Sequence, residues 1–215
     1  MIDLSKRLLK AKGYLHDATV VFDIGADHGL LSLALAKEGK KVYACENKIG
    51  PYETLVKSVK GSIYPVTCLY SDGIDVLPND VKTLVLLGMG GKTIAEILSR
   101  HPDKLSQIES ILVEPQSDVP LCVSTLNSFG FQNVDGSYIF EKRYYPILFY
   151  VRGKEELNEV ERQFGLAPLQ KKDPILIEFL NIEKRRIESL NQQGKMRNLS
   201  YYKLVLEALA YDKSE

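Results

Sequence analysis

The fold can be inferred from one segment, Val20-Val21-Phe22-Asp23-Ile24-Gly25-Ala26-Asp27-His28-Gly29. An apolar run rich in β-branched residues ends in an acid and a glycine turn, and a helical pattern of leucines and alanines follows directly. This order predicts a buried strand, a tight turn and a covering helix. Gly25 and Gly29 allow the backbone to bend sharply and to approach a bound molecule closely. Because open α/β sheets bind ligands at the carboxyl ends of their strands, we expect a ligand site at this turn.

Acidic residues end or follow three successive strand-like runs: Asp23, then Glu46 about twenty residues later, then Asp72. The first turn lacks the G-x-G-x-x-G spacing that places a pyrophosphate on a helix N-terminus. An acidic edge favours a ligand with positive charge, hydroxyls and an amine, since Glu46 can accept from a ribose diol and Asp72 from an exocyclic amine. The pattern therefore predicts an S-adenosylmethionine pocket, with ordinary capping and turn roles for these acids as the alternative.

Seven strand-like runs lie near residues 19–24, 41–45, 63–70, 83–87, 109–114, 131–140 and 144–151. Helical patterns separate the earlier runs, and such alternation predicts an α/β fold with a parallel sheet covered on both faces. Only Glu141-Lys142-Arg143 separates the last two runs, so we expect an antiparallel hairpin at the sheet edge. Seven-stranded methyltransferases end in this manner. We therefore predict a seven-stranded, Rossmann-like methyltransferase sheet.

Three motifs stand at the expected strand ends: Asp23-Ile24-Gly25-Ala26-Asp27-His28-Gly29, Ser71-Asp72-Gly73-Ile74-Asp75 and Gly88-Met89-Gly90-Gly91. Together they resemble the bacterial tRNA (adenine-22-N1)-methyltransferase family, whose start is also similar to Leu4-Ser5-Lys6-Arg7-Leu8. D-I-G motifs are common among methyltransferases, whereas their combination with G-M-G-G is more specific. The resemblance covers most of the chain. It implies an S-adenosylmethionine-dependent enzyme that methylates N1 of adenine in tRNA, at position 22.

The expected site residues form three groups. The cofactor-binding residues are Asp23, Gly25, His28, Glu46, Asn47, Asp72, Gly73, Gly88 and Met89. The substrate-binding residues are Lys6, Arg7, Gly90, Gly91, Glu114 and Tyr145. Asp27 is the catalytic candidate, because a carboxylate beside the methyl group stabilises the cationic base that N1 methylation creates, or takes a proton from its amine. The family resemblance points to the same aspartate, and its alternative role is a cap for the following helix.

The segment Gly88-Met89-Gly90-Gly91 follows the fourth strand, where amino-methyltransferases carry N-P-P-Y. We expect its glycines to leave space for an adenine ring. Two positions depart from the family pattern: Glu114-Pro115-Gln116 replaces Q-P-N, and Tyr145-Pro146-Ile147 replaces Y-E-I. Both lie toward the expected substrate side, so they bear on the choice of substrate more than on the cofactor.

The C-terminal part has a different composition. Residues 152–168 read as a charged linker followed by a turn-prone segment. Apolar residues then recur at helical spacing in Pro174–Gln192 and Met196–Ala210, with a break at Gly194. We predict a helical hairpin packed as a short antiparallel coiled coil, which grips a large substrate or another subunit, or only stabilises the fold. The expected domains are a Rossmann-like methyltransferase domain, 1–153, and a C-terminal helical domain, 154–215.

The overall charge does not indicate a nucleic-acid partner, because 28 basic residues balance 28 acidic ones in a chain of 215 residues. A tRNA enzyme then needs local basic patches. The start of the chain offers one, with leucines at helical spacing beside four cations: Leu4, Leu8 and Leu9, and Lys6, Arg7, Lys10 and Lys12. We expect a helix that packs by its leucines and presents its cations to RNA phosphates, or else a solvated helix face.

Cysteine usage and hydropathy limit the cellular compartments in which we expect the protein. Cys45, Cys68 and Cys122 form no C-x-x-C pair, which indicates a reducing compartment and no zinc site. Asp23, Asp27 and His28 are too close on one turn to hold a metal, so we expect none. No run approaches about 18 apolar residues, and no signal sequence is visible. We therefore expect a cytoplasmic monomer without a membrane partner.

Two rival functions stay open. One is a methyltransferase for a small metabolite or a protein, which would work without the N-terminal helix and the C-terminal hairpin. The other is a non-catalytic RNA-binding relative, which would have lost cofactor binding.

Overall fold

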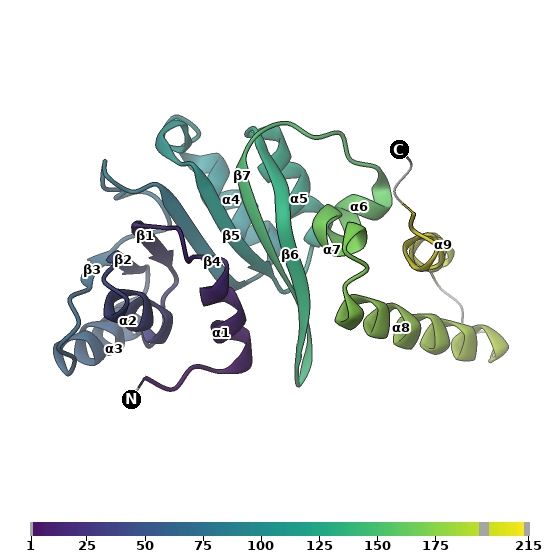
Figure 1. Ribbon diagram of the computed structural model, residues 1–215, viewed down its shortest axis with the longest axis horizontal. Coiled ribbons are helices and arrows are strands. Elements are labelled where there is room, and N and C mark those ends of the chain that lie inside the picture. Colours follow the sequence, from purple (N-terminus) through teal and green to yellow (C-terminus); the bar gives the residue numbers. More distant parts are fainter. Residues whose placement is uncertain (1, 194–197, 213–215) are drawn as a thin grey trace.

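A sheet of seven strands lies at the centre of the computed structural model, which describes residues 2–193 and 198–212 (Figure 1). The strand order is β3-β2-β1-β4-β5-β7-β6. The parallel strands are β1 (Val20–Ile24), β2 (Lys41–Glu46), β3 (Thr67–Tyr70), β4 (Thr83–Met89) and β5 (Ser110–Pro115). The strands β6 (Phe131–Glu141) and β7 (Arg143–Arg152) form the antiparallel hairpin. The predicted sheet and its edge hairpin are confirmed, although the third strand begins only at Thr67, after Pro65, which lacks a backbone donor.

Helices cover both faces of the sheet, as predicted. They are α1 (Lys6–Gly13), α2 (Leu30–Lys37), α3 (Ile49–Lys60), α4 (Gly91–Arg100) and α5 (Val119–Ser128), with a short 3-10 turn η1 (Lys104–Gln107). Alternate residues of each strand point to opposite faces. Val21 therefore packs with Leu31 and Leu35 of α2, whereas Phe22 belongs to the cluster that includes Ile94 and Leu98 of α4.

The first helix packs differently from its predicted pattern. Ser5 caps its start by accepting from the N–H of Leu8 at 3.4 Å. Ala11 and the following Leu15 are fully buried against the sheet, whereas Leu9 is 56% exposed. The prediction that Leu9 packs inward is therefore wrong, because α1 rests on the sheet through the side of the helix that carries Ala11.

Residues 152–168 are not a simple linker. They include α6 (Glu159–Phe164) and α7 (Leu166–Gln170). The side chain of Asn158 accepts from the N–H of Glu161, and the Glu161 side chain accepts from the N–H of Asn158. This reciprocal cap starts α6 in a charged stretch and corrects the linker prediction.

The C-terminal pair of helices is present as α8 (Pro174–Gln192) and α9 (Leu199–Leu209). A third apolar cluster joins Leu176 and Leu180 of α8 to Val205 of α9 and to Tyr138 of β6. Figure 1 shows α9 nearly end-on where α8 runs across the view, so the coiled-coil packing stays a prediction. The predicted break at Gly194 and start at Met196 lie outside the described residues. The division at residue 153 also stays a prediction.

Candidate functional site

The turn after β1 is built by residues in the left-handed backbone region. Gly25 has φ 70° and Gly29 φ 67°, and Asp27 between them has φ 51°. The N–H of Gly25 donates to the carbonyl of Cys45 at 2.9 Å, which fixes the turn to the end of β2. A Cβ atom at Gly25 would collide with the side chain of Met89. The sharp bend that the sequence predicted at this turn is therefore present, and the close approach to a bound molecule stays a prediction.

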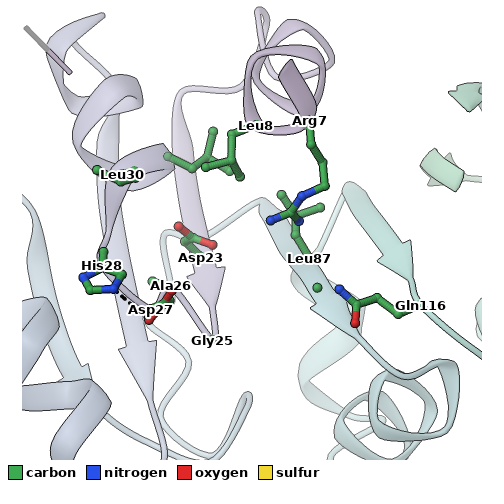
Figure 2. Close-up of a pocket in the computed structure, with 12 residues that line it drawn as sticks. Arg7, Leu8, Asp23, Gly25, Ala26, Asp27, His28, Leu30, Leu87 and Gln116 are labelled. Atoms are coloured by element: carbon green, nitrogen blue, oxygen red, sulfur yellow. Dashed lines mark ion pairs between the residues drawn. The ribbon is translucent and has the colours of Figure 1, made fainter. Parts of the chain in front are cut away.

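A cavity of about 350 Å³ opens beside this turn, at the carboxyl edge of the sheet (Figure 2). Asp23 points into it, with Asp27 and His28 on one side and Arg7 and Gln116 on the other. The lining residues come from α1, the turn after β1 and the ends of β4 and β5: Arg7, Leu8, Asp23, Gly25, Ala26, Asp27, His28, Leu30, Leu31, Leu87, Gly88 and Gln116. Carboxylates and a guanidinium thus face one cavity.

Asp23 is the most deeply buried acid that lines this cavity. Its side chain accepts from the hydroxyl of Ser32 at 2.5 Å, and the residue is only 4% exposed. Burial raises the pKa of Asp23 from 3.8 to about 6, against the lowering effect of the Ser32 hydrogen bond, and the neighbouring Glu46 raises it further. A bound cation or hydrogen-bond donor would stabilise the charged carboxylate.

The other two predicted acids lie along the same edge but do not line the cavity. Glu46 accepts from the backbone N–H of Asp27 at 2.6 Å. Asp72 accepts from the amide of Asn47 at 3.0 Å and pairs with Arg100 at 2.5 Å, and this pairing lowers the pKa of Asp72. The parallel register brings the three acids to neighbouring strand ends, as predicted. The cofactor roles of Glu46, Asn47 and Asp72 stay predictions.

Asp27 stands at the mouth of the cavity. Its side chain is 77% exposed, and its carboxylate lies 3.7 Å from Nε2 of His28. The following helix α2 has Gly29 as its N-cap and no side-chain cap. The alternative role of Asp27 as a helix cap is therefore wrong, and its carboxylate is accessible to a bound molecule. Its catalytic role stays a prediction.

The glycines after β4 serve different purposes. Gly88 has φ 73° and lines the cavity near Arg7. The N–H of Gly91 donates to the carbonyl of Ser117 at 2.8 Å, and a Cβ atom at Gly91 would lie 2.6 Å from that oxygen. The backbone after β5 thus fills the space that a side chain at Gly91 would occupy, and an adenine contact at Gly91 stays a prediction. Gly90 lies beside the side chain of Ser117 instead, and a substrate contact there stays a prediction.

Three of the expected substrate residues, one each from α1, β5 and β7, form one cluster. Arg7 pairs with the buried Glu114 at 2.6 Å, and its guanidinium carbon lies 5.6 Å from the centre of the Tyr145 ring. Lys6 is exposed one residue earlier. Lys12 pairs with Glu38. The prediction that four free cations are offered to RNA is thus wrong for Arg7 and Lys12, which are held by carboxylates.

Sequence reasoning missed several residues of the cavity. Four leucines, Leu8, Leu30, Leu31 and Leu87, form its apolar wall, and Ser32 holds Asp23. The leucines read as core residues, because a cavity wall and a core share the same periodicity. Within residues 2–193 and 198–212, no group of three side chains suits a metal ion. In the same ranges no helix has the length and apolar character to cross a membrane.

Comparisons with known proteins agree with this architecture. The sequence family described as "Methyltransferase domain" matches residues 4–148. The tRNA (adenine(22)-N(1))-methyltransferase of Bacillus subtilis (strain 168) is 30% identical over 119 residues, which are 53% of this chain and 50% of that protein. The chain thus spans about half the length of the curated relative it matches.

Solved structures match nearly the whole chain. A candidate tRNA (m1A22) methyltransferase of Streptococcus pneumoniae, in complex with S-adenosyl-L-methionine, is 25% identical with a TM-score of 0.86, over 96% of this chain and 100% of that one. The m1A22 tRNA methyltransferase TrmK of B. subtilis has a TM-score of 0.79 at 22% identity, over 98% and 95% of the two chains, and supports the fold alone. The resemblance seen in the sequence motifs is confirmed, and the chain belongs to the methyltransferase domain family.

Proposed function

We propose that this protein is an S-adenosylmethionine-dependent methyltransferase that acts on N1 of adenine 22 in tRNA. The observation that carries the proposal is the cavity beside the β1 turn, which is lined by the buried carboxylate of Asp23 and the guanidinium of Arg7. The names of the S. pneumoniae and B. subtilis relatives support the same cofactor and substrate.

The residues of the cavity fit the methionine part of the cofactor. That part carries an ammonium, a carboxylate and a sulfonium cation. Asp23 has lost most of its hydration and keeps a hydrogen bond from Ser32, so it would be stabilised by a positive group. Arg7 would complement a carboxylate. Glu46 and Asp72, at the next two strand ends, would hold the adenosine part.

The bound cofactor supplies an electrophilic methyl group, and the chain supplies the surroundings. The apolar wall of Leu8, Leu30, Leu31 and Leu87 would exclude water from the reacting atoms. The adenine N1 lone pair has to point into the cavity mouth, so the base leaves its stack first. Asp27 would then accept a proton from the N6 amine, or stabilise the positive charge that methylation places on the ring.

The proposal includes action as a monomer in the cytoplasm. Cys45, Cys68 and Cys122 are all free thiols, which is typical of proteins from reducing compartments. Sedimentation of the purified protein and fractionation of cells would test these two points.

One experiment tests the main proposal. The protein is incubated with methyl-labelled S-adenosylmethionine and a tRNA transcript, and the modified nucleosides are mapped. We expect 1-methyladenosine at position 22, and no product from a transcript with guanine at that position. Cofactor binding without transfer to tRNA would favour a small-molecule or protein substrate. Absence of cofactor binding in calorimetry would favour a non-catalytic RNA-binding relative.

A further inference from the structure

The β6–β7 hairpin extends beyond the strands next to it. The pairing of β7 with β5 ends at Val113 with Leu148, whereas the pairing of β6 with β7 continues to Glu141 with Arg143. The last residues of the hairpin therefore overhang the carboxyl edge of the sheet, where the cavity opens. Figure 1 shows this tip reaching past the other strands, between α1 and α8.

The tip carries cations that the fold does not use. Lys142 and Arg143 are exposed, and their side chains have no hydrogen bond or ion pair to any described residue. The nearby acids are engaged, because Glu141 lies 3.8 Å from Arg7 and Glu178 accepts from the hydroxyl of Tyr144 at 2.7 Å. The tip thus presents net positive charge to solvent.

The same tip also exposes an aromatic ring. Phe140 is 50% exposed, and its ring centre lies 4.8 Å from that of Tyr144. Tyr144 in turn packs on Phe179 of α8 at 5.3 Å. The Phe140 ring therefore has an aromatic neighbour that limits its motion while the side chain stays accessible to a base.

The tip is physically joined to the cavity. Arg7, which lines the cavity, lies 3.8 Å from Glu141 and 5.6 Å from the ring centre of Tyr145.

Lys142 has φ 66°, a backbone conformation that glycine would adopt without strain. A lysine at this position costs some stability relative to glycine, so a glycine variant separates the contribution of the side chain to binding from its effect on folding.

We propose that the hairpin tip, residues 140–144, is an RNA-contacting element that binds the substrate beside its target base. Lys142 and Arg143 bind phosphates of the flanking backbone, and Phe140, which lies on the α8 face of the hairpin, stacks on a base of the strand that flanks the target. The inference rests on the proposed function, because it assigns the surface that receives the tRNA.

The test compares three variants of the full-length protein. Lys142→Glu with Arg143→Glu should weaken tRNA binding by about tenfold or more and lower the slope of log K against log salt by about 1 to 2. Phe140→Ala should reduce turnover about tenfold and suppress the fluorescence rise of 2-aminopurine at position 22, which reports the base leaving its stack. Lys142→Gly should weaken tRNA binding although it relieves backbone strain and leaves the unfolding midpoint equal or higher.

Matched controls separate this surface from general effects. Lys57→Glu with Lys60→Glu makes the same charge change on α3, which packs on the β2 and β3 side of the sheet. Val134→Ala removes a 45% exposed side chain from the far end of β6. S-adenosylmethionine affinity should be unchanged in every variant.

One outcome would count against the inference about the hairpin tip, and another would count against the proposed function. Tip variants that bind and methylate tRNA as well as the controls would overturn the inference, while the proposed function would stand. If the wild type binds tRNA without methylating it and the tip variants lose that binding, the inference is supported and the proposed function fails.

Discussion

The guanidinium of Arg7 donates to Oε2 of Glu114 at 2.6 Å, and this bond joins α1 to the end of β5 although 107 positions of sequence separate the two residues. Glu114 is fully buried, and its Oε1 has no hydrogen-bond partner among the described residues. Burial raises the pKa of Glu114, whereas the bond from Arg7 opposes this shift. Arg7 thus holds a buried charge in place and lines the cavity at the same time.

Removing Arg7 should be costly for this reason. Arg7→Ala leaves the buried carboxylate without its partner, and we expect a loss of about 3 kcal/mol in the free energy of unfolding, measured with urea. Glu114→Gln keeps the shape and restores the family's usual residue, so Arg7→Ala should cost less in that background. An equal cost of Arg7→Ala in both backgrounds would show that the pair is not coupled.

The pKa of Asp23 predicts a pH dependence. With a pKa of 3.8 unfolded and about 6 folded, the folded protein holds the proton more tightly between these values. Stability relative to Asp23→Asn should therefore fall as pH rises from about 4 to about 6, by up to about 3 kcal/mol. A difference that stays flat over this window would show that Asp23 is not perturbed.

The affinity for the cofactor should also depend on the protonation of Asp23, but it should increase with pH where the stability decreases. The carboxylate form of Asp23 attracts a cation, so binding of S-adenosylmethionine should tighten as pH rises through about 6. Calorimetry from about pH 5 to about 8 measures this dependence for the wild type and for Asp23→Asn. The α-amino group of the ligand titrates near the upper end of this range, and its contribution is corrected in the same way for both proteins. In Asp23→Asn the affinity should be lower and lack this step, and a step that persists there would assign the titration to another group.

Asp27 should matter for turnover and not for folding. Asp27→Asn removes the negative charge from the cavity mouth, and we expect kcat to fall about 100-fold or more with little change in cofactor affinity. Asp17→Asn is a matched control, because Asp17 is also an exposed acid beside a histidine, His16, at 2.9 Å. Equal activity of the two variants would remove Asp27 from the mechanism.

The sheet and the ligand turn were predictable because their signals are local. β-Branched runs such as Val20–Ile24 locate strands, and an acid followed by glycines locates the turn. The side of the sheet on which ligands bind follows from the parallel order of the strands. These steps need no knowledge of contacts between distant residues.

The features that were not predicted depend either on contacts between residues far apart in the sequence or on a helical pattern that charged residues obscure. Arg7 and Glu114 were expected at the substrate side separately, but nothing in the sequence pairs residues so far apart. The helix α6 lies in a charged stretch in which only Val160 and Phe164 keep helical spacing. Its start was nevertheless visible in Asn158-x-x-Glu161, a capping-box pattern.

Gly91 gives the sharpest test of the sequence hypothesis against the structure. A methyl group at Gly91 would press on the backbone after β5, at 2.6 Å from the carbonyl of Ser117, so Gly91→Ala should destabilise the protein by about 2 kcal/mol. Gly90→Ala would place its methyl group 3.1 Å from the Ser117 hydroxyl, which can rotate away, and should cost less than about 1 kcal/mol. Urea unfolding and turnover measured on both variants decide the matter: normal stability with lost transfer in Gly91→Ala would support the idea that this glycine makes room for the base.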